Sequence, residues 1–389
     1  MAVPCHAPDL PVSVRAWRLM LPFVLLAAVA CGGRGGSTQP IKIGLQSTFG
    51  DPLGLPLRFG AQLAAQEINA QGGIHGRPIE FVEADDYGNA DSAVAAAERL
   101  ARSDVVAVVG GAFSGPTLAA AAVYNDPAHA VVEISPSASS PEVTFAGDWT
   151  FRVCAGDLAH AVQLASFVRQ QLNLTRGAVL YMDNQYGRGF REVFVSEFKK
   201  LGGQVVLSGP YLPDRPGDTG PYFDLIKRNG QVQFLLAASY ETDGAELLRQ
   251  MRKRSRGIPL LGGDGLEGLQ REGAIAEGAY QTAAYLPALA TPENQAFVQR
   301  YHQAFPTIDP PNQTAAATYD IVRLLAQVIG DAGTGRKAIR DALAQVGTKR
   351  PAFAGVTGPI QFDANGDVPT KKVLIAMIKG GSVHLVEGQ

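Results

Sequence analysis

From Ile41 onward, short apolar runs alternate with amphipathic segments. The apolar runs are rich in β-branched residues and predict buried strands, whereas the segments between them repeat their apolar residues at helical spacing. We expect Gly72 and Gly73 to end the first helix and Asp91 to cap the second. Strands that alternate with helices indicate a parallel sheet covered by helices. The expected elements are strands over 41–47, 78–86 and 105–111 and helices over 59–71 and 91–102.

A second series of alternating elements follows Cys154. Two more helices and a terminal hairpin are expected beyond it, with Gly366 and Asp367 as the turn between the hairpin's apolar runs. So many strands favour an α/β fold of two doubly wound parallel-sheet lobes over one large sheet. The expected elements are strands over 177–183, 204–212, 232–239 and 259–263, helices over 160–172, 189–202, 222–230, 244–254, 291–305 and 314–330, and the hairpin over 358–381.

The first thirty residues have a different pattern. Arg15 and Arg18 precede an apolar run, 19–30, which is short for a membrane span and is followed by Cys31. A basic flank, an apolar core and small residues in this order predict a secretory signal peptide over 1–30, the alternative being a buried N-terminal helix. Residues 28–31 also resemble a bacterial lipoprotein box, with Ala28 in place of the usual Leu. We therefore expect lipidation at Cys31 and a flexible tether over 31–40.

Composition excludes several classes of function. The chain has 389 residues, of which 46% are hydrophobic and 18% charged, with a net charge of −2 and no basic field for a nucleic-acid partner. The six histidines are scattered and show no metal-ligand spacing, so neither a metal nor a cofactor is expected. Removal of the signal and lipidation of Cys31 would leave only Cys154, which we interpret as a small buried residue rather than a nucleophile.

Two loops after predicted strands carry anion-binding chemistry. In the first, Gly110 and Gly111 precede Ser114 and a helix expected to begin near Pro116, whose free amides would face the open edge of the sheet. This loop lacks a phosphate-binding Lys and a nucleophile elbow, so it favours carboxylate binding over catalysis. The alternative is that Ser114 only caps the helix. The second loop, 133–144, offers Ser137 and Ser139, or is an ordinary turn.

An ammonium group requires a carboxylate in a partly dry cleft. Asp264 follows the predicted strand 259–263 and is suitably placed, although it could instead be a solvated turn residue. Tyr186 and Tyr240 follow other strands and combine an apolar face with a polar tip. Surface tyrosines in loops are common, so these two residues are candidates only.

Three segments together resemble the type I periplasmic binding proteins of the leucine/isoleucine/valine family. They are the stretch from Gly60 to Asp86, "MDNQYGRGF" at 182–190 and "GPIQFDANGD" at 358–367, and the resemblance extends from about Ile41 to Ile378. It implies two α/β lobes that are joined by three crossover segments and close on one small ligand. The implied lobes are 41–156 with 283–360 and 157–282 with 361–389.

The resemblance also implies roles for the candidate residues. Ser114, Ser137 and Ser139 match positions that hold the ligand's α-carboxylate. Asp264 matches the acidic residue that receives the amine, where Glu is commoner, and Asp157 matches a second acidic position. The aromatic positions that wall the pocket correspond to Tyr186 and Tyr240. The family often has a Tyr near the ligand, about where this chain has Leu53.

The function implied by this resemblance is an extracytoplasmic solute-binding protein of an ABC importer, not an enzyme. The expected ligand is a branched-chain or related amino acid, and the expected partner is a membrane permease. We expect the protein in the periplasm or on the outer face of the cell membrane, held by a lipid at Cys31. The alternatives are a receptor or sensor module for amides or other small acids, and a hydrolase whose residues meet only in space.

Overall fold

The computed structural model describes residues 39–213, 215–254 and 257–386, in which the strands form two large sheets and one small pair. The first sheet has five parallel strands in the order β2-β1-β3-β4-β5. The predicted signal peptide, most of the tether and Cys31 lie outside the described residues. The strands of the first sheet are β1 (Ile41–Ser47), β2 (Ile79–Asp85), β3 (Ala107–Val109), β4 (Glu133–Ser135) and β5 (Thr150–Arg152).

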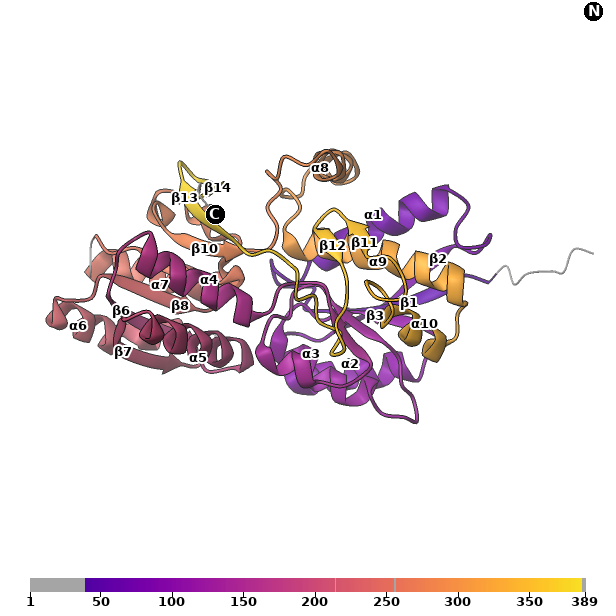
Figure 1. The fold of residues 1–389 in the computed structure, drawn as a ribbon, viewed down its shortest axis with the longest axis horizontal. Helices are drawn as coiled ribbons and strands as arrows, with labels where there is room; N and C mark the ends of the chain where they lie inside the picture. The colour runs from indigo at the N-terminus through magenta and orange to yellow at the C-terminus, as the bar shows by residue number, and fades with distance from the viewer. Residues whose placement is uncertain (1–38, 214, 255–256, 387–389) are drawn as a thin grey trace, which may run out of the picture. The chain divides into compact units, whose positions relative to one another are not determined.

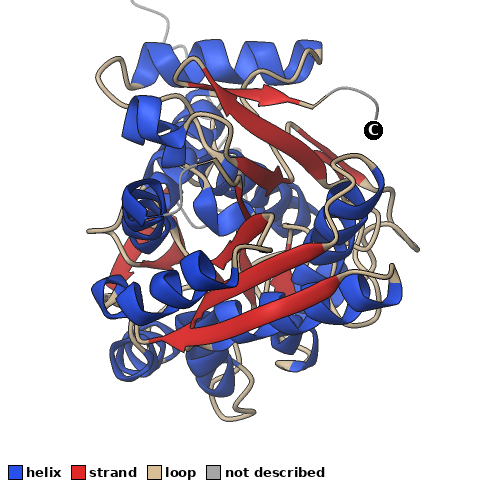
Figure 2. Ribbon diagram, turned by 90° about the vertical axis from the view of Figure 1, so that its left-hand side faces the viewer, coloured by secondary structure: helices blue, strands red, loops and turns tan. Residues whose placement is uncertain are grey.

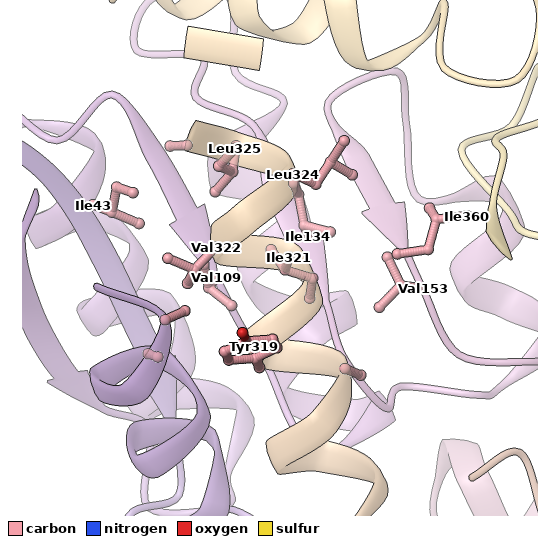
Figure 3. Packing of buried hydrophobic residues seen from close by; sticks show 14 of the residues in the cluster. Ile43, Val109, Ile134, Val153, Tyr319, Ile321, Val322, Leu324, Leu325 and Ile360 are labelled. Atoms are coloured by element: carbon pink, nitrogen blue, oxygen red, sulfur yellow. The ribbon is translucent and has the colours of Figure 1, made fainter. Parts of the chain in front are cut away.

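Helices cover both faces of the first sheet. On one face, alternate strand residues such as Ile43 and Val109 join a core with α1, α8, α9 and α10. Figure 3 shows α9 crossing this face, with Ile321 and Val322 in that core. On the other face, α2 and α3 pack over Val108 and Val131. The helices are α1 (Pro56–Ala70), α2 (Ala90–Ala101), α3 (Ser114–Tyr124), α8 (Pro292–Ala304), α9 (Gln313–Ala332) and α10 (Arg336–Leu343).

Gly60 allows α1 and α9 to approach closely. A Cβ atom at this position would lie 2.1 Å from the carbonyl oxygen of Ala315 in α9. Only Gly leaves room for that backbone contact. The opening residue of the first family-like segment is therefore a packing residue of the scaffold.

The second sheet has seven strands in the order β14-β13-β10-β9-β8-β6-β7. β13 is antiparallel to both of its neighbours, and the other pairs are parallel. Figure 2 shows helices on both sides of the strands. The strands are β6 (Arg176–Met182), β7 (Gln204–Tyr211), β8 (Phe234–Ala238), β9 (Leu260–Gly262), β10 (Tyr280–Ala283), β13 (Leu374–Lys379) and β14 (Ser382–Leu385).

The helices of the second sheet bury opposite faces of the same strands. In β6, Val179 faces α4 and α5, whereas Ala178 and Leu180 face α6 and α7. Asn184 caps α5 by accepting a hydrogen bond of 2.9 Å from the Gly187 amide. The helices are α4 (Asp157–Gln170), α5 (Gln185–Lys200), α6 (Gly220–Asn229) and α7 (Glu241–Arg254). Short 3-10 helices are η1 (Pro141–Phe145), η2 (Pro216–Thr219), η3 (Asp264–Leu266) and η4 (Leu269–Ala276).

The chain passes three times between the two large sheets: after β5, after β10 and after β12. The last passage is the yellow segment of Figure 1, which leads to β13. The fold is therefore the α/β architecture expected from the sequence. The unit around each large sheet is built from two separate segments of the chain. The small pair consists of β11 (Phe353–Gly355) and β12 (Gly358–Ile360).

Two local predictions are wrong. The hairpin expected around Gly366 and Asp367 does not form, because β12 pairs with β11 while β13 pairs with β10 and β14. In addition, α2 is capped by Asn89, whose side chain accepts a hydrogen bond from the Ser92 amide, and Asp91 lies inside the helix. The local sequence was compatible with more than one strand pairing in the first case and with more than one capping residue in the second.

A buried carboxyl in β4 is expected to make stability depend on pH. Glu133 is fully buried, and neither of its carboxyl oxygens has a hydrogen-bond partner among the described residues. Burial, followed by the nearby charge of Asp86, raises the pKa of Glu133 well above its usual value. The folded protein thus holds a proton that the unfolded chain releases. The stability that this bound proton provides is fully present below the unfolded pKa of about 4.3 and is lost as the pH rises.

We therefore expect Glu133→Leu to raise the free energy of unfolding by about 1–3 kcal/mol, because it removes an unpaired buried polar group. The gain should grow between pH 5 and 7, by at most about 1.4 kcal/mol per pH unit. Urea unfolding at several pH values measures both effects, with Glu98→Leu on the exposed face of α2 as the control. If the gain in the free energy of unfolding is constant over this pH range, the pKa of Glu133 is not raised in the folded protein.

Candidate functional site

The candidate site is a small cavity, about 30 Å³ in this structure, and its lining comes from the loops of both large sheets. These loops follow the carboxyl ends of parallel strands, where ligands bind in open α/β sheets. Loops of the first sheet provide Leu53, Ala112, Phe113, Ser137 and Ser139. The second sheet provides Tyr186, Tyr240, Asp264, Gly265 and Glu267. The start of α9 adds Gln313 and Thr314.

Hydrogen bonds join the two serine-bearing loops of the first sheet. The Ser137 hydroxyl donates to the carbonyl oxygen of Ala112 at 2.9 Å. The Ser114 hydroxyl accepts from the Ser140 amide at 3.2 Å. Ser114 is the first residue of α3, and Phe113 stands at the N-cap without a side-chain cap bond. The helix consequently begins two residues before the expected Pro116, and Ser114 joins the loops instead of capping.

Arg152 holds the second serine loop in place. Its guanidinium donates to the carbonyl oxygens of Ser139 and Ser140 at 3.0 and 2.9 Å. The same group forms a two-point ion pair with Asp367, at 2.6 and 2.9 Å. Arg152 is therefore committed to the scaffold, and it orients the Ser139 backbone at the edge of the cavity.

Three aromatic rings form one wall of the cavity. Tyr186 and Tyr240 are stacked, with ring centroids 4.8 Å apart and an interplanar angle of 14°. Phe113, from the first sheet, meets Tyr240 edge-on at 4.6 Å. Burial raises the pKa of both tyrosines, so their hydroxyls remain protonated donors. Such a wall offers apolar faces together with polar tips.

Asp264 lies at the start of η3 and its side chain is 8% exposed. The Tyr186 hydroxyl is 3.4 Å from one carboxylate oxygen, and His160 Nε2 is 3.7 Å from the other. Burial is the main cause that lowers the pKa of His160, so the imidazole is neutral near pH 7 and does not cancel the Asp264 charge. Asp264 is thus a carboxylate that a ligand cation can approach.

Two of the predicted site residues lie behind the lining of the cavity. Asp157 begins α4 and is fully buried, and its amide donates to the carbonyl oxygen of Ser139 at 2.7 Å. Burial and then the Asp264 charge raise the pKa of Asp157. Ser114 is also buried and is not among the residues that line the cavity, and its backbone and side chain hydrogen-bond with Tyr240. Ser137, Ser139, Tyr186, Tyr240 and Asp264 reach the cavity directly.

Sequence reasoning missed two polar residues of this region. Glu267 lines the cavity and accepts hydrogen bonds from the Gln313 amide at 3.0 and 3.2 Å. His160 lies three residues after Asp157 on α4, a spacing that places both side chains on one helix face. The signal for Glu267 was its position in the same loop as Asp264, three residues further on.

Several features bear on catalysis and on other ligands. Cys154 is buried as predicted, and burial raises the pKa of its thiol to about 12, which makes it a poor nucleophile. Within residues 39–213, 215–254 and 257–386, no group of three His, Cys, Asp or Glu side chains is arranged to hold a metal. Across the same described residues, every helix is too short or too polar to cross a bilayer.

Comparisons with known proteins agree with this geometry. The Leu/Ile/Val-binding protein homolog 1 of Brucella suis is 26% identical over 88% of this chain and 91% of its own length. The leucine-, isoleucine-, valine-, threonine- and alanine-binding protein of Pseudomonas aeruginosa is 28% identical over 88% and 92%. A branched-chain amino acid transporter substrate-binding protein of Streptococcus pneumoniae, solved with isoleucine, is 28% identical, with a TM-score of 0.80 over 89% of this chain and 99% of that one.

The sequence model of one family, described as periplasmic binding protein, matches residues 40–382. This match extends over nearly all of the described residues and includes both large sheets. It is a family of solute-binding proteins rather than a family known for catalysis. The protein thus belongs to the periplasmic binding protein family, and the cavity between the loops of its two sheets lies where two α/β sheets present their strand ends.

Proposed function

We propose that this protein is an extracytoplasmic solute-binding protein of an ABC importer and that it holds a branched-chain or related amino acid in the described cavity. The observation that carries the proposal is the placement of opposite chemistry across one cavity. Polar residues of the serine loops, from the first sheet, line the cavity together with a carboxylate, Asp264, from the second. The names of the Brucella and Pseudomonas relatives and the isoleucine in the Streptococcus structure support the same ligand class.

The serine loops and Asp264 each suit one end of an amino acid. A carboxylate is held well by backbone amides and hydroxyl groups without a full positive charge. An ammonium group requires a carboxylate whose own charge is not already neutralised. Asp264 meets this requirement because its neighbours are a tyrosine hydroxyl and a neutral imidazole. The aromatic wall would cover the apolar part of the ligand.

A hydrolase is the alternative with a specific observation behind it. The Thr282 hydroxyl is 2.8 Å from His160 Nδ1, and the other ring nitrogen faces Asp264, an order that is similar to a catalytic triad. Thr282 is fully buried and does not line the cavity, so a substrate would not reach its oxygen. A binding protein therefore accounts for this cluster better than an enzyme does.

A thermal-shift screen of the protein from residue 31 onward tests the proposed function. We expect one or a few amino acids to raise the melting temperature, because a ligand that binds only the folded state adds about 2.7 kcal/mol at one hundred times its Kd. Calorimetry on each hit then gives the Kd. Stabilisation only by compounds that lack an α-amine would overturn the role of Asp264. Turnover of amides or esters would favour the hydrolase.

We further propose that Cys31, outside the described residues, carries a lipid that holds the protein at the outer face of the membrane. The small residues before it and the glycine-rich sequence after it support this reading. Cells grown with radiolabelled palmitate should yield labelled wild-type protein, and Cys31→Ala should yield none. Cys154→Ala is the matched control and should remain labelled, because that thiol is buried in the folded protein. Unlabelled wild-type protein would contradict the anchor.

A further inference from the structure

Glu267 gives the cavity a second carboxyl. It follows η3 and lies in the same short loop as Asp264. Across the cavity it meets the first turn of α9, where its two oxygens share the Gln313 amide at 3.0 and 3.2 Å. A carboxylate offers about four acceptor positions, so one shared amide leaves most of them available.

The lining of the cavity contains no cation to match these carboxyls. None of the residues that line it is Lys, Arg or His. Two guanidinium groups whose charges act on this region are committed elsewhere. Arg152 is paired with Asp367, whereas Arg271 is paired with Glu241 at 2.6 Å and with Asp309 at 3.0 Å. Glu267 is half-buried, and its hydrogen-bond partner is a single backbone amide, so a ligand that donates hydrogen bonds would satisfy its remaining acceptor positions.

The residues around Glu267 are also polar. Gln313 and Thr314 complete that end of the cavity, whereas the rings of Phe113 and Tyr240 and the Leu53 side chain form the apolar part. A branched aliphatic side chain that reached Glu267 would bury the carboxyl without giving it a hydrogen bond. That loss makes a purely aliphatic ligand a poor match for this end.

We propose that Glu267 is a specificity-determining residue, and that the ligand is an amino acid whose side chain ends in a nitrogen that donates hydrogen bonds. This inference rests on the proposed function and assigns the α-amine to Asp264 and the side-chain nitrogen to Glu267. The donor is either a protonated amine or a neutral amide, and both have the N–H groups that a carboxyl accepts.

The protonation of Glu267 distinguishes the two kinds of donor. Burial, with smaller contributions from the charges of Asp264 and Glu241, raises the pKa of Glu267 to about 8, and the Gln313 amide and Arg271 oppose this shift. At pH 7 the empty site therefore holds a proton on this carboxyl. A cationic side chain favours the ionised form and should displace that proton on binding, whereas an amide should displace little of it.

Isothermal calorimetry with matched ligands tests the inference. Ornithine and norleucine differ only by an ammonium in place of a methyl group, and glutamine and leucine provide the amide and aliphatic arms. We expect wild-type protein to bind ornithine or glutamine at least tenfold more tightly than norleucine and leucine. Measurements at pH 7 in two buffers of different ionisation enthalpy should show close to one proton released with ornithine, and its affinity should rise with pH up to about 8.

Glu267→Gln is the informative variant, because its amide oxygen can still accept from the Gln313 amide and keep the fold. We expect the ornithine preference to fall to within threefold of norleucine and the proton release to disappear. Glu98→Gln, exposed on α2, should leave both unchanged. A thermal melt of each variant checks that it folds. Should Glu267→Gln lose its fold, Glu267→Asp replaces it and is expected to weaken the preference by its shorter reach.

The failures of the two proposals are distinguishable. If leucine or norleucine binds as tightly as ornithine and glutamine, the proposed function stands and the role of Glu267 is wrong. An unchanged preference in Glu267→Gln would also overturn that role. If no amino acid binds or stabilises the wild-type protein, the proposed function fails and the inference built on it fails as well.

Discussion

Asp264→Asn is expected to weaken amino-acid binding by roughly 30- to 5,000-fold, while the protein still folds. The change removes the charge that faces the ligand's ammonium, and loss of one partner of a buried charge pair costs about 2–5 kcal/mol. Asn has the same shape as Asp, so the contacts with Tyr186 and His160 can remain. Calorimetry with the tightest ligand from the screen measures the effect.

The control for this prediction is Asp224→Asn. Asp224 is a 63% exposed carboxylate on α6, paired loosely with Arg254 at 3.6 Å, and does not line the cavity. Asp224→Asn also removes one negative charge from the part of the protein around the second sheet, and it should leave the Kd unchanged. If Asp264→Asn binds within threefold of wild type, the ammonium is held elsewhere and Asp264 has only a packing role.

Asp320→Ala is expected to lower the free energy of unfolding by about 3–5 kcal/mol, because it leaves several buried donors unpaired. Asp320 lies in α9 and is fully buried. One of its oxygens accepts from the Val356 amide at 2.8 Å, and the other accepts from the Thr357 amide at 2.9 Å and the Thr357 hydroxyl at 2.6 Å. This one side chain therefore joins α9 to the segment that ends in β12.

Lys371 makes the effect larger. Its ammonium donates to the Thr357 hydroxyl at 2.6 Å, and burial lowers its pKa to about 8 while the Asp320 charge opposes that shift. Without Asp320 a buried ammonium loses its counter-charge. Urea unfolding measures the loss, and Asp331→Ala on the exposed end of α9, paired with Arg350, is the control with an expected change below about 1 kcal/mol. A loss below 1 kcal/mol in Asp320→Ala would contradict this account.

Much of the candidate site followed from where the loops stand in the chain. Ser137 and Ser139 follow β4 and Asp264 follows β9, so each was expected at the carboxyl end of its own sheet. That the two sheets share one site was implied by the family resemblance. Glu267 escaped prediction because a Glu in a Gly-rich turn usually points to solvent. Its place in the cavity goes with a hydrogen bond from the Gln313 amide, a contact between positions 46 residues apart.

The wrong terminal hairpin has a similar cause. The apolar runs around β12 and β13 carry the alternation typical of strands, and a Gly-Asp turn lies between them. Strand partners are nevertheless chosen by the hydrogen bonds and packing available in the folded chain. β13 pairs with β10, with Ile375 opposite Thr282, and β12 pairs with β11.

By itself, the sequence determined the order of strands and helices and the α/β architecture of two sheets, because apolar periodicity, caps and glycine stops act within a few residues. Only the tertiary structure decided which polar side chains face the cavity and which stand behind it. Asp264 meets His160 and Glu267 meets Gln313 through contacts between distant parts of the chain. The burial and charge around such long-range contacts arise from tertiary packing, which no local sequence pattern encodes.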